Sequence, residues 1–592
     1  MTDHGYKYFL MKFIRPHVPT LTFLLVLQFV CMLFSFASPL LVKSLIDDVF
    51  IGGKTELFNI ILLATAATYV ISAVSAYLSS YSKGKLELVL FNDVVKEAFD
   101  AVQSASMRKT EEMKVGDLIS RIVVNTRSAI AIFTQIIPLV FFNAACMIIP
   151  FIIMLLYSWQ LTLIVTIPAL LFVLPMSFFG KRLEQTQKVS LMRTGLIYSL
   201  LKECLSIVPL IKVFRLEEWS RCKLDEQMKG YYDASIDYTK NSSLNSSVDS
   251  MIYGVPMILL FVFGGPMLMQ GSLTIGTFTL FLSNIALVFG PISQFAYLWS
   301  YYKSSSPSFE RVEEILHLER DIGGYEGLII KNGKVDFNNI SFSYNDRYIL
   351  QGFNATFNRG LNYVIGENGT GKSTILKLLC ALYPLEKGSI EIDGQDIAMV
   401  KNADLRKNIS MIFSEPYLFD GSIYENILIG NLLASEEEVK SAAKLVRIHE
   451  FITNLPQGYK TQVGESGLKL SSGEKQKIAL ARAILKDSPI ILLDEVTKSI
   501  DADSRRSINE VIKSLKNEKT IIIVTHDTNE IEYDSNKIYL GQKNNLNDAA
   551  FSYASCQISN EASFAGQKRT TEKAIATRIS TLLLGHLPRI EL

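Results

Sequence analysis

Charged residues are missing from long parts of this chain of 592 residues. Lys, Arg, Asp and Glu make up 20% of the sequence and nearly cancel to a net charge of +1, while hydrophobic residues make up 49% and the mean hydropathy is +0.24. This balance leaves no basic footprint for a nucleic acid, so we expect no nucleic-acid partner. Because a helix crosses a bilayer with about 20 apolar residues, the charge-free stretches predict membrane spans. These stretches are residues 18–42, 57–82, 128–180 and 250–302.

Cysteine is scarce as well, and its spacing excludes the usual metal-binding patterns. We expect reduced thiols rather than a disulfide framework, because no CxxC pair is present. A cleavable signal peptide is not expected either, since the first charge-free stretch is too long for a signal-peptide core and no small-residue cleavage site follows it. The six cysteines are Cys31, Cys146, Cys204, Cys222, Cys380 and Cys556.

The two longest charge-free stretches each predict two helices joined by a tight turn, because one apolar helix of 53 residues is far longer than a bilayer requires. Turn-forming residues at 157–160 and 269–276 divide them. Lys and Arg concentrate before the first span and in residues 83–127 and 181–249, which predicts that these segments are cytoplasmic. We therefore expect a multi-pass protein of the cell (plasma or inner) membrane, with the N-terminus and the long region after residue 303 in the cytoplasm. The six expected spans are 18–42, 57–82, 129–156, 160–180, 250–269 and 276–302.

The sequence changes character after residue 303. A charged helix and a linker come first, and then short apolar strands, glycine turns and helices alternate as in an α/β domain. The predicted fold class is an all-α polytopic membrane domain followed by an α/β P-loop NTPase domain. Its expected parts are a six-helix transmembrane domain with long cytoplasmic loops at 1–305, a linker at 306–332, an ATP-binding domain at 333–541 and a polar, poorly ordered tail at 542–592.

A complete phosphate-binding pattern stands near the start of the α/β region. Residues 366–373 read GENGTGKS, which matches G-x-x-x-x-G-K-[ST] in full, follows an apolar strand and opens a helix. The glycines let backbone N–H groups face phosphates, the lysine reaches the β- and γ-phosphates, and the serine offers its hydroxyl to Mg²⁺. The pattern predicts ATP and Mg²⁺ as cofactors. The residues expected to bind them are Gly366, Glu367, Asn368, Gly369, Thr370, Gly371, Lys372, Ser373 and Thr374.

A second strand carries the acids that such a loop needs. The run IILLDE at 490–495 ends an apolar strand in two carboxylates, which are costly to bury without a cation nearby. Asp494 is the expected second Mg²⁺ ligand beside Ser373, and Glu495 is expected to polarise the attacking water. The predicted reaction is hydrolysis of ATP, with Glu495 and Lys372 as catalytic residues.

In their order and spacing, these motifs resemble those of the ATP-binding cassette (ABC) transporters. The whole of residues 10–541 is similar to an exporter-type half-transporter, in which six spans are fused to one nucleotide-binding domain. The resemblance implies that Tyr344, which ends the run FSY, stacks on adenine. It also implies that His526, in the run VTHD, contacts the γ-phosphate as a catalytic residue.

The run LSSGE at 470–474 stands where the family carries its signature L-S-G-G-Q. In the family, the signature of one chain closes over the phosphate-binding loop of another. The resemblance therefore implies that Ser471 and Gly473 bind nucleotide. It also implies that the partners are a second half-transporter, in a homodimer or a heterodimer, together with the lipid bilayer and a transported cargo.

Several positions depart from the family pattern. Ser414 stands where the family has a glutamine that touches Mg²⁺ and the attacking water. Ser472 and Glu474 replace a glycine and the glutamine of the signature, and Lys498 replaces the serine of the family's T-S-A-L-D run. The lysine, the Mg²⁺ acid and the general base are retained, so these departures bear on rate and coupling more than on ATP binding.

The function that these patterns favour is ATP-driven export across the plasma membrane by alternating access. The spans hold few polar residues and no prominent acid or base, which suits an amphipathic or apolar cargo (a peptide, a lipid or a drug-like molecule) better than an ion. One alternative is an ATP-binding, weakly catalytic regulatory subunit of a heterodimeric ABC complex, which Ser414 and Lys498 would suit. Another is a channel gated by ATP.

Overall fold

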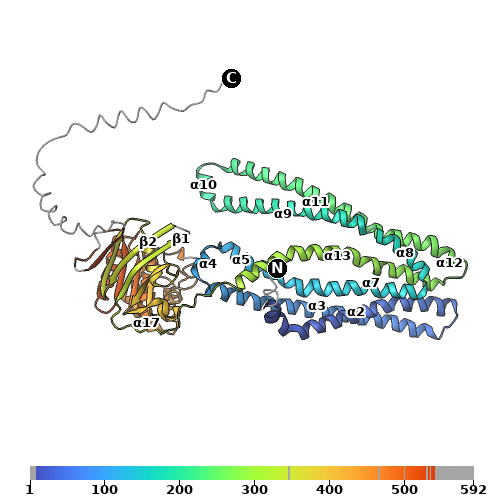
Figure 1. Ribbon diagram of the computed structural model, residues 1–592, viewed down its shortest axis with the longest axis horizontal. Coiled ribbons are helices and arrows are strands. Elements are labelled where there is room, and N and C mark those ends of the chain that lie inside the picture. The colour runs from blue at the N-terminus through green and yellow to red at the C-terminus, as the bar shows by residue number, and fades with distance from the viewer. Residues whose placement is uncertain are drawn as a thin grey trace, which may run out of the picture. The chain divides into compact units, whose positions relative to one another are not determined.

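The computed structural model describes residues 8–171, 173–344, 347–464, 467–498, 500–527, 531–533 and 535–540. The chain separates into two compact units, Met1–Ile322 and Gly323–Leu592. The first unit is helical, and the second combines sheets with helices (Figure 1).

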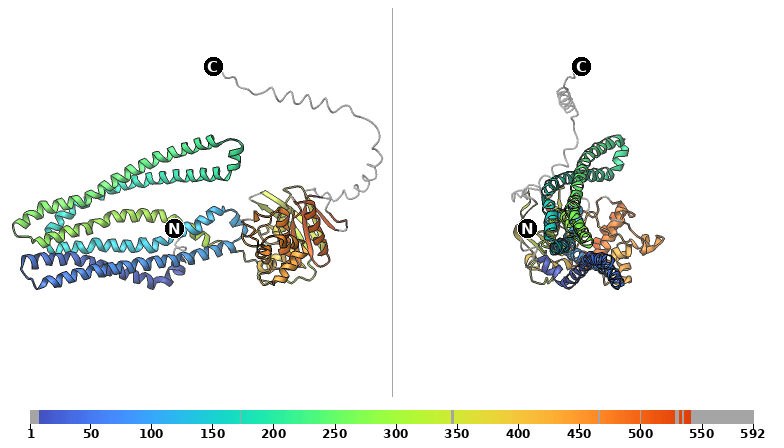
Figure 2. Two further views of the ribbon diagram at one scale, coloured as in Figure 1. Left: turned by 180° about the vertical axis from the view of Figure 1, so that it is seen from behind. Right: turned by 90° about the vertical axis from the view of Figure 1, so that its right-hand side faces the viewer.

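Helices far longer than a bilayer is thick make up the first unit. At about 1.5 Å per residue, α11 alone spans roughly 65 Å, about twice the hydrocarbon thickness, so such helices continue beyond the membrane. Figures 1 and 2 show α9 and α11 running side by side, joined by the short α10. The elements are η1 Leu10–Ile14, η2 Arg15–His17, α2 Val18–Ser44, η3 Leu45–Ile51, α3 Leu57–Ser104, α4 Met107–Glu111, α5 Val115–Ile119, η4 Ser120–Asn125, α6 Thr126–Ala131, η5 Ile132–Ile136, α7 Ile137–Tyr157, α8 Trp159–Leu171, α9 Val173–Ser206, α10 Val208–Val213, α11 Glu217–Leu259, η6 Leu260–Gly264, α12 Gly265–Met269 and α13 Ile275–Leu316.

Within the described residues, five continuous helical segments are long and apolar enough to cross a membrane. Five of the six expected spans lie inside them. The remaining expected span, 160–180, falls on α8 and α9, on either side of residue 172, which lies outside the described residues, and it stays a prediction. The five segments are Leu10–Ile51, Leu57–Ser104, Val115–Tyr157, Glu217–Met269 and Ile275–Leu316.

Two sheets build the second unit. One is antiparallel with the order β2-β1-β4-β5, and the other is parallel with the order β6-β7-β8-β3-β9. The parallel strands are almost wholly apolar because helices cover both faces of such a sheet. The strands are β1 Val335–Tyr344, β2 Arg347–Phe357, β3 Gly360–Gly366, β4 Lys387–Ile392, β5 Gln395–Asp396, β6 Ile409–Ile412, β7 Ile490–Asp494, β8 Thr520–Thr525 and β9 Asn536–Leu540.

Three helices of this unit begin with a capping box. A serine caps α16, α17 and α19, and in each helix the glutamate three residues later hydrogen-bonds back to the serine's backbone N–H, which completes a capping box. The expected tail at 542–592 lies outside the described residues. The elements are α14 Lys372–Leu379, η7 Ile397–Met399, α15 Asn402–Lys407, α16 Ile423–Leu428, α17 Glu436–Leu445, α18 His449–Asn454, η8 Gly458–Lys460, α19 Ser472–Lys486 and α20 Ala502–Ser514.

The carboxylate of Asp393 joins the segment just before β1 to the antiparallel sheet. Asp393 lies in the Asp-Gly turn between β4 and β5, in the left-handed conformation (φ 50°) that such two-residue turns require. Its two oxygens accept hydrogen bonds of 2.7–3.0 Å from four successive backbone N–H groups. Partial burial acts to raise the pKa of Asp393, but these N–H groups outweigh it and hold the pKa below its usual value. The four donors are those of Lys331, Asn332, Gly333 and Lys334.

We expect Asp393→Ala to destabilise the second unit by about 2–3 kcal/mol, because hydrogen bonds to a charged acceptor are stronger than neutral ones and four N–H groups lose theirs. Since the folded-state pKa lies below the unfolded one, the stabilisation is present at neutral pH and is lost as the pH falls through the folded-state value. Thermal unfolding of the full-length protein at pH 7 and at about pH 2, well below the usual aspartate pKa of about 3.9, measures both effects. Glu518→Ala, at an exposed carboxylate, is the control, and an equal loss in both variants would contradict the role of Asp393.

Candidate functional site

The predicted phosphate-binding loop connects β3 to α14. Gly369 and Gly371 have φ values of +83° and +98°, in the left-handed region that glycine adopts without strain. A Cβ on Gly371 would also lie 2.7 Å from Ile349 Cγ2. Glycine is therefore required at position 371 by both conformation and space.

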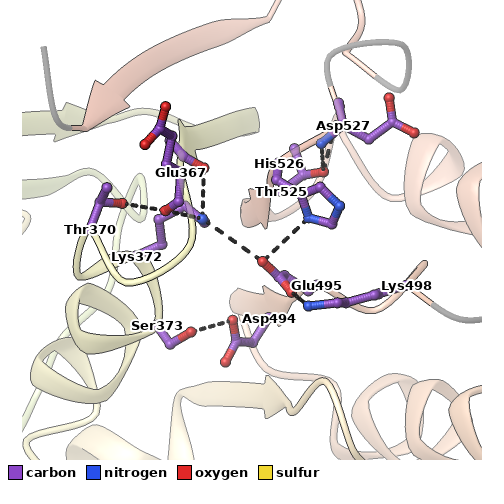
Figure 3. A network of polar contacts seen from close by, with 11 residues as sticks. Glu367, Thr370, Lys372, Ser373, Asp494, Glu495, Lys498, Thr525, His526 and Asp527 are labelled. Carbon is purple, nitrogen blue, oxygen red and sulfur yellow. Dashed lines mark hydrogen bonds and ion pairs between the residues drawn. The ribbon is translucent and has the colours of Figure 1, made fainter. Parts of the chain in front are cut away.

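Lys372 is turned back into this loop. Its ammonium group donates hydrogen bonds to the carbonyl oxygens of Gly366 (2.7 Å) and Glu367 (2.9 Å), and its side chain is only 5% exposed (Figure 3). The Thr370 hydroxyl also donates to the Glu367 carbonyl. The loop thus holds a buried cation beside its backbone N–H groups, an arrangement suited to phosphate oxygens.

The end of β7 faces the same loop. Asp494 Oδ1 accepts a hydrogen bond of 2.8 Å from the Ser373 hydroxyl. Burial raises the pKa of Asp494 above its usual value and the neighbouring Glu495 charge adds to the rise, while the Ser373 hydroxyl and two lysines oppose it. A buried carboxylate beside a hydroxyl is an oxygen donor pair that fits Mg²⁺, which binds through one or two protein ligands, substrate phosphates and water.

Glu495 lies among two lysines and a histidine. Its Oε1 is 3.8 Å from Lys372 Nζ and 3.5 Å from His526 Nδ1, and its Oε2 is 2.7 Å from Lys498 Nζ (Figure 3). Partial burial alone would raise the pKa of Glu495, but the hydrogen bond from Lys498 and the charges of Lys498, Lys372 and His526 hold it below its usual value. The carboxylate is therefore ionised at neutral pH and available to orient water.

The parallel sheet explains why these groups meet. β7, β8 and β3 are neighbours, and the carboxyl ends of parallel strands lie at one edge. Lys372 follows β3, Glu495 follows β7 and His526 follows β8. The lysine expected to bind phosphate, the expected acid and the expected histidine therefore lie close together.

The remaining predicted residues lie on other elements. Ser471 caps α19, and its hydroxyl accepts from the Glu474 N–H. Gly473 is buried, and a Cβ there would lie 2.8 Å from the Ser504 hydroxyl. Tyr344 ends β1 and makes edge-to-face ring contacts with two aromatic neighbours, Phe342 and Tyr383. In the loop and α14, Asn368 is exposed and Thr374 is buried.

Ser414 is exposed, and its backbone carbonyl accepts a hydrogen bond of 2.7 Å from the Gln476 side chain. Gln476 is buried on α19, and its side-chain oxygen has no hydrogen-bond partner within the described part of the chain. Sequence reasoning missed this contact, which joins residues far apart in the chain. It noted Lys498 as a departure but missed its ion pair with Glu495, although opposite charges three residues apart were a usable signal.

Comparison with known proteins finds similarity along most of the chain. Residues 21–292 match the ABC transporter transmembrane region, and residues 350–498 match the ABC transporter ATP-binding domain family. The chain is 27% identical over 521 residues to the ATP-dependent lipid A-core flippase of Syntrophus aciditrophicus (strain SB), covering 87% of each protein. It is 28% identical over 535 residues to the putative multidrug export ATP-binding/permease protein YgaD of Bacillus subtilis (strain 168), covering 88% of this chain and 92% of that one.

A solved structure shares the fold. It is that of a bacterial Atm1-family ABC exporter with ATP bound, and it superposes with a TM-score of 0.75 over 89% of this chain and 94% of that chain, at 24% sequence identity. The predicted fold class, a helical membrane domain followed by an α/β nucleotide-binding domain, is thereby confirmed.

We expect Gly371→Ala to weaken nucleotide binding roughly tenfold or more, because left-handed strain costs about 1–2 kcal/mol in alanine and the new methyl group would collide with Ile349. Binding of a fluorescent ATP analogue to the full-length protein measures this. Gly394→Ala is the matched control, since Gly394 also has positive φ (+84°) but open space around it, in the turn after β4. Equal affinities of the two variants would show that the collision at position 371 is unimportant.

Proposed function

The chain belongs to the ABC transporters, and from this we propose that it exports an amphipathic or apolar cargo across the plasma membrane by alternating access. It hydrolyses ATP and couples the hydrolysis to transport. The observation that carries the proposal is the meeting of Lys372, the Ser373–Asp494 pair and Glu495 at one edge of the parallel sheet.

Each residue of this edge has a proposed role in hydrolysis. The N–H groups of the loop at 366–374 and Lys372 hold the ATP phosphates, and Lys372 counters charge on the β- and γ-phosphates. Ser373 and Asp494 would hold Mg²⁺, which would neutralise phosphate charge. Glu495 orients water for in-line attack on the γ-phosphorus and receives its proton, while the bond to the β-phosphate oxygen breaks and ADP leaves. His526, 3.5 Å from Glu495, would contact the γ-phosphate.

We further propose that two such chains share the nucleotide. Ser471 and Gly473 belong to an element separate from the phosphate-binding loop, and a second half-transporter would supply the corresponding residues. The partner is an identical chain or a related one. Tyr344 would stack on adenine, because it ends β1 with its ring against an existing aromatic cluster.

The proposed cargo class rests on the spans and on the relatives. The named relatives are a lipid A-core flippase and a putative multidrug export protein, and lipids and drugs both fall within the proposed cargo class. In this chain, Asn143 on α7 and Asn284 on α13 are buried, and their amide nitrogens have no hydrogen-bond partner among the described residues. Amides of this kind can serve a cargo's polar end when the helices separate, while the apolar walls receive the rest.

The proposed orientation places the N-terminus and the ATP-binding domain in the cytoplasm, because Lys and Arg gather next to the spans on that side. A regulatory subunit that does not pump is not favoured, since both Asp494 and Glu495 are present at the site and the named relatives are exporters.

We expect Glu495→Gln to lower ATP hydrolysis at least about 100-fold, because loss of a general base typically costs 10²–10⁴-fold, while ATP-analogue binding stays within about twofold, since Lys372 and the loop remain. The variant should also lose ATP-dependent movement of cargo. Full-length protein in vesicles, tested with a fluorescent phospholipid and with a lipophilic dye, measures both activities.

The matched control is Glu436→Gln, which removes an ion-paired glutamate on α17, away from β7. If wild type and Glu495→Gln were equally inactive, the self-sufficient pump would be wrong and a required second subunit would be sought. If ATP hydrolysis were normal but ATP produced ion conductance instead of cargo movement, the channel would be favoured.

A further inference from the structure

The two carboxylate oxygens of Glu495 contact different side chains. Oε1 faces Lys372 and His526, at 3.8 and 3.5 Å, while Oε2 is held by Lys498 at 2.7 Å. Figure 3 shows Lys372 and Lys498 approaching the carboxylate from opposite sides. The Lys498 contact is the shortest of the three, and it is a hydrogen bond as well as an ion pair.

The backbone around Glu495 produces this contact. Glu495 has a left-handed conformation (φ 47°), and its N–H donates to the Val524 carbonyl of the neighbouring strand. The Lys498 N–H then donates to the Glu495 carbonyl at 3.0 Å. This i to i+3 bond closes a turn directly after β7, so that the side chain three residues later folds back onto the carboxylate.

Bound ATP would change the contacts of Lys372 and Lys498 differently. Lys372 belongs to the phosphate-binding loop, where its ammonium now donates to two backbone carbonyls, and arriving phosphates would draw it to themselves. Lys498 is on the turn after β7, and its side chain is 46% exposed. It lies on the far side of Glu495 from the loop, so it can keep its hydrogen bond when the phosphates are bound.

We propose that Lys498 is a positioning residue for hydrolysis: by holding Oε2 of Glu495, it keeps Oε1 directed at the place of the attacking water. This inference rests on the proposed role of Glu495 as the base. Lys498 thereby supplies an orienting contact from the same strand end that carries the base.

If the Lys498–Glu495 salt bridge were purely structural, its loss would have different consequences. Ion pairs with a solvent-exposed partner contribute little to stability, so loss of a purely structural pair would leave both folding and turnover almost unchanged. Misdirection of a catalytic carboxylate lowers turnover without weakening substrate binding, because the phosphates are held by other groups.

The test compares steady-state ATP hydrolysis by the full-length protein in lipid vesicles for wild type, Lys498→Met, Lys498→Arg and Glu495→Gln. For Lys498→Met we expect kcat to fall roughly tenfold with the KM for ATP within about twofold of wild type, and Lys498→Arg should restore kcat. Lys513→Met is the matched control, because Lys513 forms an ion pair with Glu532 at 3.2 Å and is 47% exposed; it should behave like wild type. In the Glu495→Gln background, Lys498→Met should cause no further loss.

The outcomes separate this inference from the proposed function. If Glu495→Gln abolishes hydrolysis while Lys498→Met matches or exceeds wild-type kcat, Glu495 is the base and the positioning role is overturned. A rise in KM with unchanged kcat would also overturn it, since Lys498 would then act on nucleotide binding. If Glu495→Gln hydrolyses ATP at the wild-type rate, the proposed function of Glu495 fails and the role of Lys498 fails with it.

Discussion

The second unit depends on one geometric constraint, which is that the neighbouring parallel strands β7, β8 and β3 end at the same edge of their sheet. Each strand is largely buried and mostly apolar, and its charged or histidine residues appear at or just beyond the end where it leaves the sheet. A phosphate-binding lysine, two carboxylates and a histidine are brought together for this reason. Their separation in the chain is large, but their separation in space is a few ångströms.

At this edge, the polar groups are paired with one another. Lys372 donates to loop carbonyls, the Ser373 hydroxyl donates to Asp494, and Glu495 is surrounded by cations. Such pairing satisfies buried polar groups that would otherwise be costly. Because ATP and a divalent cation would replace these internal contacts with similar ones, binding requires exchange of partners rather than exposure of unpaired charges.

The membrane unit follows a different constraint. A bilayer offers backbone groups no water, so spans must be helical and nearly free of charge, and the charges gather where the helices extend past the membrane. The long α9–α10–α11 hairpin shows such an extension, with an apolar beginning in α9 that gives way to charged residues. Burial of amides such as Asn284 is the exception in the spans, and in a transporter an intramembrane polar group is a candidate for contact with cargo.

Features that depend on local composition or on a short pattern could be predicted from the sequence. The charge-free stretches predicted the spans, and GENGTGKS predicted a phosphate loop between a strand and a helix, because glycine conformation and helix initiation are local properties. Asp494 and Glu495 could be recognised because they end an apolar run. The roles of Ser471, Gly473 and Tyr344 toward nucleotide stay predictions.

Which side chains meet could be seen only in the folded structure. Asp393, in a turn, accepts hydrogen bonds from backbone N–H groups about sixty residues earlier, and Gln476 reaches the carbonyl of Ser414 across a similar separation. The Lys498–Glu495 pair is close in sequence, yet it forms because a left-handed residue after β7 turns the chain back on itself. Such contacts depend on three-dimensional packing and on individual backbone angles, which residue patterns along the chain do not specify.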